Sequence, residues 1–132
     1  MEEIQLEFKG YRLDSMNFGI KNIAGIYIVY LGTFDESTKT IEPTRILFIG
    51  ASNHMGEDIR KNKSRDCWMS HISDKNEKIA YSYSLYDKSD LQTIKNILVN
   101  KFKPLCNEEV KSIDHNYKIK TTGDNALIEM DF

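Results

Sequence analysis

A basic run near the middle of the chain has the clearest capacity for binding chemistry. Within "RKNKSR", residues 60–65, four of the six side chains carry positive charge: Arg60, Lys61, Lys63 and Arg65. Ammonium and guanidinium groups neutralise the phosphates of nucleic acids, so the run predicts a small nucleic-acid-binding patch. The alternative is the solvated end of a helix, which contacts no ligand.

The cysteines and histidines contain the donor atoms of a metal site. Cys67, His71, Cys106 and His115 together offer the thiol and imidazole groups that hold tetrahedral zinc. Their spacing lacks the tight pairs usual in such sites, and two cysteines are too few for a disulfide framework. The sequence therefore favours buried or reduced thiols and predicts no cofactor.

The composition is typical of one globular domain. The chain has 132 residues, of which 40% are hydrophobic and 29% charged, and its two prolines and seven glycines mark no linker. No apolar run reaches 18 residues, and the acidic start "MEEIQLEFKG" is unlike a leader peptide, which predicts a cytoplasmic protein without membrane contact. A net charge of −2 excludes coating of nucleic acid by bulk charge and leaves only local contacts.

Apolar residues that alternate with polar ones at 4–8 and 79–85, and a run rich in β-branched and aromatic residues at 23–31, predict strands. The expected strands are residues 4–8, 23–31, 46–50 and 79–85. The second and third are consecutive with no crossover helix between them, so we expect them to pair antiparallel across a polar loop at 32–45. The N-terminal strand is expected at a sheet edge. Gly123 and Asp124 predict a turn between two short strands in the tail.

Helix signals follow the third and the fourth strand. A short helix is expected from Ser52 or Asn53 to about residue 62, with one more helical turn around Trp68. The best-marked helix lies between Ser89 and Pro104, because Ser89 and Gln92 have the spacing of a capping box and Pro104 ends the helix.

Two tripeptides and a later segment give this order of elements a resemblance to a known family. Gly25-Ile26-Tyr27 lies on one expected strand and Phe48-Ile49-Gly50 on the next, and "KPLCN", with Pro104 and Asn107, ends the last helix. Together they resemble the GIY-YIG nuclease family over roughly residues 20–108. The resemblance implies an α+β fold in a single domain over residues 1–132: a small central antiparallel sheet flanked by helices, here with extra N- and C-terminal strands. The alternative is an unrelated α+β domain with ordinary strand aromatics.

The resemblance also implies a reaction. Family members cut phosphodiester bonds with tyrosines from the two strands, an arginine and often a histidine on the next helix, a metal-binding glutamate on the later helix and a final asparagine. The carboxylate holds a divalent cation, a base deprotonates water, and the arginine meets charge on the phosphate. Three positions of this chain match the family: Tyr27, Gly50 and Asn107.

Four positions depart from the family. Phe48 replaces the second tyrosine, Asp58 the arginine, Asn62 the histidine and Lys95 the glutamate. A protonated lysine cannot ligate magnesium, and an aspartate repels phosphate. The resemblance therefore implies a degenerate site with no assignable catalytic residue and no metal ligand. Because Asp58 and Lys95 exchange the family's charges, we expect them in one cleft, as an ion pair or sharing a water.

Arg60 is the obvious substitute for the missing arginine. Two residues along a helix correspond to a rotation of about 200°, so Arg60 is expected to point away from the side that Asp58 faces. Only a bulge before the helix, which Gly56 would permit, brings Arg60 into the site.

Three functions remain open on these residues. The first is a degenerate nuclease-like domain that binds nucleic acid through Tyr27, Asn107 and the basic run, with Tyr27 and Asn107 lining one cleft. The second is a protein-binding regulator or inhibitor on the same fold. The acidic isoelectric point and the long loop at 32–45 favour this function. The third is an active Mg²⁺-dependent endonuclease in which Arg60 and an unassigned carboxylate, such as Asp87 or Asp90, do the chemistry.

Overall fold

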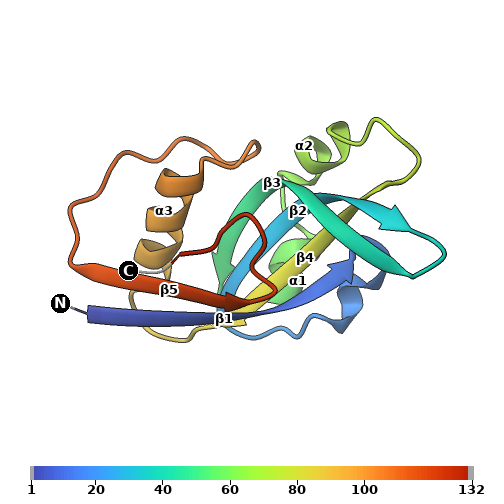
Figure 1. The fold of residues 1–132 in the computed structure, drawn as a ribbon. Helices are drawn as coiled ribbons and strands as arrows, with labels where there is room; N and C mark the ends of the chain where they lie inside the picture. The colour runs from blue at the N-terminus through green and yellow to red at the C-terminus, as the bar shows by residue number, and fades with distance from the viewer. Residues whose placement is uncertain (1, 131–132) are drawn as a thin grey trace.

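The computed structural model describes residues 2–130. Its elements are β1 (Glu2–Leu13), the 3-10 helix η1 (Asp14–Gly19), β2 (Gly25–Asp35), β3 (Thr40–Ser52), α1 (Met55–Arg60), α2 (Arg65–Ser70), β4 (Glu77–Leu85), α3 (Leu91–Phe102) and β5 (Tyr117–Gly123). The strands form one sheet in the order β3-β2-β4-β1-β5, with helices on both faces (Figure 1). The α+β class predicted from the sequence is confirmed.

The sheet is antiparallel except at one end. β2 lies between β3 and β4 and pairs antiparallel with both, and β1 continues the antiparallel order beside β4. β5 joins β1 in parallel, so the N-terminal strand is not the sheet edge that the sequence predicted. The chain turns at Gly123, whose φ is +80°. The second tail strand expected after this turn is absent from the described residues; that segment instead exchanges hydrogen bonds between Thr121 and Met130.

The β2–β3 hairpin is longer than predicted. The two strands stay paired as far as Asp35 and Thr40, so the expected loop at 32–45 is mostly strand. Asp35 closes the short turn by accepting hydrogen bonds from Ser37 and Thr38. β4 pairs with β2 only as far as Thr33, and beyond it the hairpin is a two-stranded ribbon. The prediction was wrong because the residues of such a ribbon are mostly exposed and show little apolar alternation.

Both faces of the sheet bury a hydrophobic cluster. On β2, Ile26, Ile28 and Tyr30 belong to the cluster that includes the apolar residues of α3. The alternate residues Tyr27, Val29 and Leu31 belong to the cluster that includes residues of α1 and α2. Side chains of successive strand residues point to opposite faces, which explains this division. Tyr27 therefore points toward α1 and α2.

The helices begin and end close to the predicted positions, but their caps differ. Asp90 is the N-cap of α3 and makes no side-chain capping bond, and Gln92 donates to the Ala51 carbonyl, so the predicted capping box does not form. Lys103 ends α3 in the left-handed conformation just before Pro104. α1 begins after His54, because Ser52 Oγ accepts a hydrogen bond from the His54 backbone instead of capping the helix. Within residues 2–130, no helix combines the length and apolarity needed to cross a membrane.

Candidate functional site

A cleft of about 510 Å³ lies at the β3 edge of the sheet, where residues of α3, of the segment after α1 and of the loop after α3 meet. Its lining includes five of the seven positions singled out from the sequence: Phe48, Asp58, Asn62, Lys95 and Asn107. The other two, Tyr27 and Gly50, are buried. Residues from four separate segments of the chain are thus brought to one place.

Tyr27 is held by two polar side chains that line the cleft. Its hydroxyl donates a hydrogen bond to the Asp58 carboxylate and accepts one from Asn62 Nδ2 at 2.9 Å. The ring is fully buried. Burial raises the pKa of Tyr27, and the hydrogen bond to Asp58 raises this pKa further, against a smaller opposing effect of Asn62. The hydroxyl therefore stays protonated and engaged, which makes it unsuited to deprotonate a water molecule.

Gly50 leaves the space that the Tyr27 ring occupies. The two residues are partners across the β2–β3 ladder. A Cβ added at Gly50 would lie 2.3 Å from Tyr27 Cζ and 2.4 Å from its hydroxyl oxygen. Tyr27 of the first tripeptide therefore packs directly on Gly50 of the second. This packing requires a glycine opposite the tyrosine, which explains why the two residue types occur together.

Phe48 forms an apolar wall of the cleft. Its ring centroid lies 6.1 Å from that of Tyr27 and 5.5 Å from that of Trp68. Trp68 itself is fully buried in α2. These contacts fix the Phe48 ring by aromatic packing, and the position offers no hydroxyl for chemistry.

Asp58 and Lys95 line the same cleft, but they do not form the direct ion pair that the sequence predicted. Within residues 2–130, no bridge of 4.0 Å or less joins their charged groups, and the Asp58 carboxylate is engaged by Tyr27 instead. Partial burial lowers the pKa of Lys95, while the negative charge of Asp58 acts in the opposite direction. The two charges therefore interact across the cleft without contact. A shared water between them stays a prediction.

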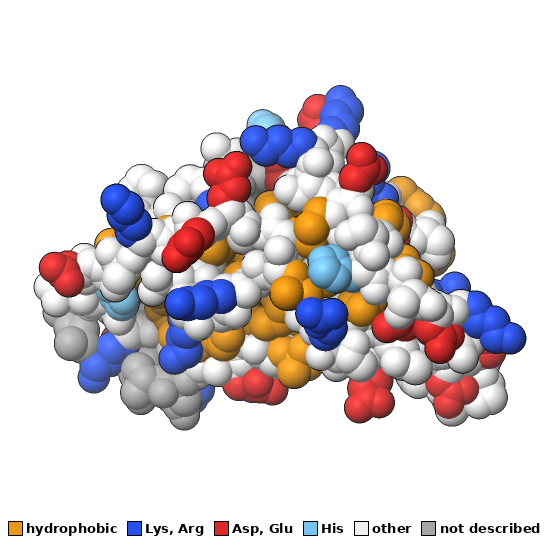
Figure 2. All heavy atoms as spheres, turned by 90° about the horizontal axis from the view of Figure 1, so that it is seen from above, with side chains coloured by type: hydrophobic (Ala, Val, Ile, Leu, Met, Phe, Trp, Pro, Cys, Tyr) orange, Lys and Arg blue, Asp and Glu red, His pale blue; other side chains and the backbone are white. Residues whose placement is uncertain are grey.

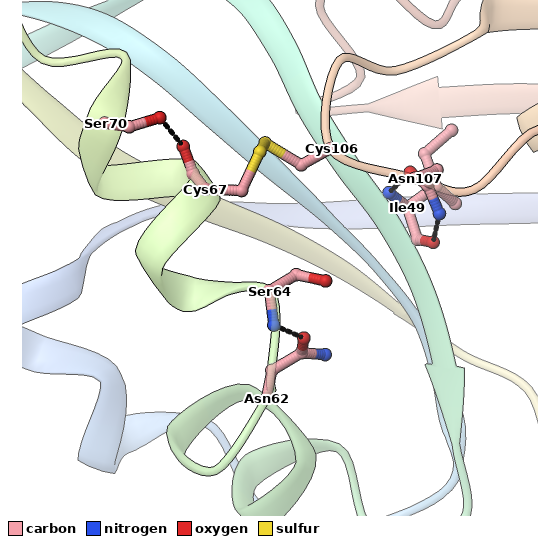
Figure 3. Close-up of a disulfide and its surroundings, with 7 residues drawn as sticks. All are labelled: Ile49, Asn62, Ser64, Cys67, Ser70, Cys106 and Asn107. Carbon is pink, nitrogen blue, oxygen red and sulfur yellow. Dashed lines mark hydrogen bonds between the residues drawn. A yellow bond between two sulfur atoms is a disulfide. The ribbon is translucent and has the colours of Figure 1, made fainter.

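Asn107 has a structural role that the sequence did not reveal. Its side-chain amide accepts a hydrogen bond from Ile49 N at 2.8 Å and donates one to the Ile49 carbonyl at 2.9 Å (Figure 3). The neighbouring Cys106 N donates to Leu47 O at 2.7 Å. The loop after α3 thus satisfies the open edge of β3. Asn107 lines the cleft while Tyr27 lies beneath its surface, so the two do not form opposite walls.

The basic run does not act as one patch. Lys61 and Lys63 line the cleft, whereas Arg60 is exposed and is not among its lining residues, as the helical rotation predicts. Arg65 donates to both carboxylate oxygens of Asp14, at 3.0 and 2.9 Å. Its guanidinium also donates to the Ile59 carbonyl and the Tyr81 hydroxyl, so Arg65 ties together η1, α1 and β4.

The residues of the cleft do not fit the divalent cation that the resemblance implies. Lys95 stands where the resemblance implies a carboxylate ligand, and the Asp58 carboxylate is hydrogen-bonded to Tyr27. Glu108 and Glu109 also line the cleft, but within residues 2–130 they form no group of three close ligands. Asp87 and Asp90, the two carboxylates suggested from the sequence as substitutes, do not supply a metal ligand in the cleft either. Asp90 accepts hydrogen bonds from the Tyr86 and Tyr117 hydroxyls at 2.5 and 2.9 Å, and neither Asp87 nor Asp90 lines the cleft.

The two cysteines form a disulfide, which corrects the expectation of free thiols. Cys67 on α2 and Cys106 in the loop after α3 are 39 residues apart in sequence and are joined through their sulfurs (Figure 3). Neither residue has a sequence signal for this pairing, because only the folded chain brings α2 beside the β3 edge. His71 lies beside the disulfide, whereas the His115 ring packs at a tilt against the Tyr117 ring.

Comparisons with protein-family models, curated proteins and solved structures find no match to this chain, so the likeness to the GIY-YIG family rests on its motifs and their order.

Proposed function

We propose that this protein is a catalytically degenerate nuclease-like domain that binds nucleic acid in the cleft without cleaving it. One observation carries the proposal: Lys95 lines the cleft, and it stands at the position where the family resemblance implies a metal-binding carboxylate. The Tyr27 hydroxyl, which would serve the attacking water, is buried and bound to Asp58 and Asn62.

The lysines of this region support nucleic acid as the partner. Lys61, Lys63 and Lys95 line the cleft, and Lys103 and Lys111 line an adjoining hollow of about 290 Å³ that shares residues 107–110 with it. The same linings hold three carboxylates, those of Asp58, Glu108 and Glu109, and Lys61 is also paired with Glu57 at 3.0 Å, so the lysines are in small excess. The chain as a whole has a net charge of −2, so positive charge is concentrated here. Such local concentration is what phosphate binding requires.

The test is a titration of labelled single- and double-stranded DNA and RNA, followed by fluorescence anisotropy at several salt concentrations. Replacing Lys61 and Lys63 by alanine should weaken binding to duplex DNA and flatten its log–log salt dependence by about 0.9 for each phosphate that is no longer neutralised. Arg60→Ala is the matched control, because Arg60 belongs to the same run but lies outside the cleft. An equal effect of both changes would place the binding surface elsewhere.

A protein partner is the second candidate, and the charge balance within the cleft itself favours it. Counted without the adjoining hollow, the lining has three lysines and three carboxylates. Figure 2 shows basic and acidic side chains interspersed on the face seen from above. A surface of mixed sign suits a protein segment of mixed charge. Nucleic-acid binding that is absent, or whose salt slope the lysine changes leave untouched, would favour this candidate.

A further inference from the structure

The disulfide has a third potential metal ligand beside it. The two sulfurs of Cys67 and Cys106 and a ring nitrogen of His71 all lie within 4.8 Å of one another. Within residues 2–130, this is the one group of three or more histidine, cysteine or acidic side chains placed closely enough to hold a metal ion. All three residues are partly exposed, so an ion and a water molecule can reach them.

We propose that the reduced protein binds one zinc ion through Cys67, His71 and Cys106, and that the disulfide is the metal-free, oxidised form of the same site. Zinc takes thiolate sulfur at about 2.3 Å and imidazole nitrogen at about 2.0–2.1 Å in a tetrahedral arrangement, which places its ligand atoms about 3.5–3.8 Å apart. Opening the disulfide lets the sulfurs move apart to this distance by side-chain rotation. The fourth position is open and takes water.

The backbone around the site is held by contacts that do not depend on the disulfide. Cys106 N donates to the Leu47 carbonyl, and Asn107 pairs through its amide with Ile49. On the other side, Trp68 next to Cys67 is fully buried. The Cα atoms of the two cysteines, 5.9 Å apart, therefore stay close after reduction. His71 is the C-cap of α2, four residues after Cys67, and its backbone keeps helical angles, so its side chain lies on the same side as that of Cys67.

The reaction balances with a dithiol as reductant. Two electrons and two protons pass from the dithiol to the Cys67–Cys106 bond, giving two cysteine thiols and an oxidised dithiol. Zinc binding then forms two Zn–S bonds and one Zn–N bond and releases the two thiol protons to solvent. In the predicted cytoplasmic location, glutathione and thioredoxin would hold the cysteines as thiols, so the zinc form would be the form present there.

Metal titration of the full chain tests the proposal. The reduced protein, prepared with a dithiol that is then removed anaerobically, is titrated with Co²⁺ as a spectroscopic probe and with Zn²⁺ against a chromophoric chelator. The expected result is one ion per chain, with the visible absorption of tetrahedral cobalt and a sulfur-to-cobalt charge-transfer band. The oxidised protein should show neither.

His71→Ala separates the metal site from the disulfide. It should weaken zinc binding by about 10-fold or more, since loss of a ligand costs at least as much as loss of a group that orients one. It should leave the oxidised protein unchanged in melting temperature. His115→Ala is the control and should bind zinc as the wild type does.

A second readout covers the possibility that reduction loosens the fold. Zinc should raise the melting temperature of the reduced wild type, or restore a cooperative transition, and should do neither for His71→Ala. A reduced wild type that shows no tetrahedral cobalt spectrum and no zinc-dependent stabilisation overturns the proposal. So does a His71→Ala variant that binds zinc with unchanged affinity.

Discussion

Replacing both Cys67 and Cys106 by alanine is expected to lower the free energy of unfolding by about 2–4 kcal/mol. The disulfide closes a loop across 39 residues of sequence. By reducing the entropy of the unfolded chain, closing a loop of this length stabilises the folded protein by about 4 kcal/mol at 25 °C. This value is an upper bound, because unfolded chains keep some structure. The disulfide also joins α2 to the loop that covers the β3 edge.

Urea unfolding of the oxidised wild type and the double variant, both with a metal chelator present, measures this change. The reduced wild type in the same buffer is the matched control and should unfold close to the double variant, because it loses the same constraint without any substitution. A difference between oxidised wild type and double variant below about 0.5 kcal/mol would show that the disulfide does not constrain the fold as described.

Gly50→Ala is expected to lower the free energy of unfolding by about 1–3 kcal/mol, the usual cost of overpacking a well-packed core. The added Cβ would meet the Tyr27 ring at 2.3 Å. That ring cannot swing away freely, since it is fully buried and its hydroxyl is bound to Asp58 and Asn62. The substitution should therefore also displace the polar groups that form the floor of the cleft.

A double-mutant cycle attributes this cost to Tyr27. In a Tyr27→Ala background the ring is gone, and adding Gly50→Ala should then cost less than about 0.5 kcal/mol. Equal costs in both backgrounds would mean that the backbone of β3, and not the packing of Tyr27 on Gly50, limits this position. Thermal or urea unfolding of the four proteins completes the cycle.

Local sequence patterns predicted the parts of the fold that are rich in buried apolar residues. The strand around Ile26 is buried on both faces and is a run of β-branched and aromatic residues, whereas α3 has one buried face that its apolar spacing marks. The ribbon beyond Thr33 is mostly exposed and gave no such signal. The capping box predicted for α3 does not form, because Gln92 donates to a tertiary partner, the Ala51 carbonyl, which no local pattern encodes.

For the candidate site, the sequence predicted which residues lie together but not which partners they contact. Motif order was enough to indicate that Asp58, Asn62 and Lys95 would share one cleft, which is where the structure places them. The partners of each side chain were not predictable, because Asn107 pairs with the backbone of Ile49 and Arg65 with Asp14, 51 residues away. The Cys67–Cys106 disulfide likewise depends on the packing of α2 beside the β3 edge.

A nuclease assay tests most directly the claim that the cleft binds without cutting. Purified protein is incubated with single- and double-stranded DNA and RNA in the presence of Mg²⁺ or Mn²⁺, and a Tyr27→Phe variant, which keeps the ring and loses the hydroxyl, is purified in parallel. We expect no cleavage by either protein above the buffer background, because Lys95 lies where the family resemblance implies a metal-binding carboxylate and Tyr27 stays protonated. Reproducible metal-dependent cleavage by the wild type that Tyr27→Phe abolishes would contradict it.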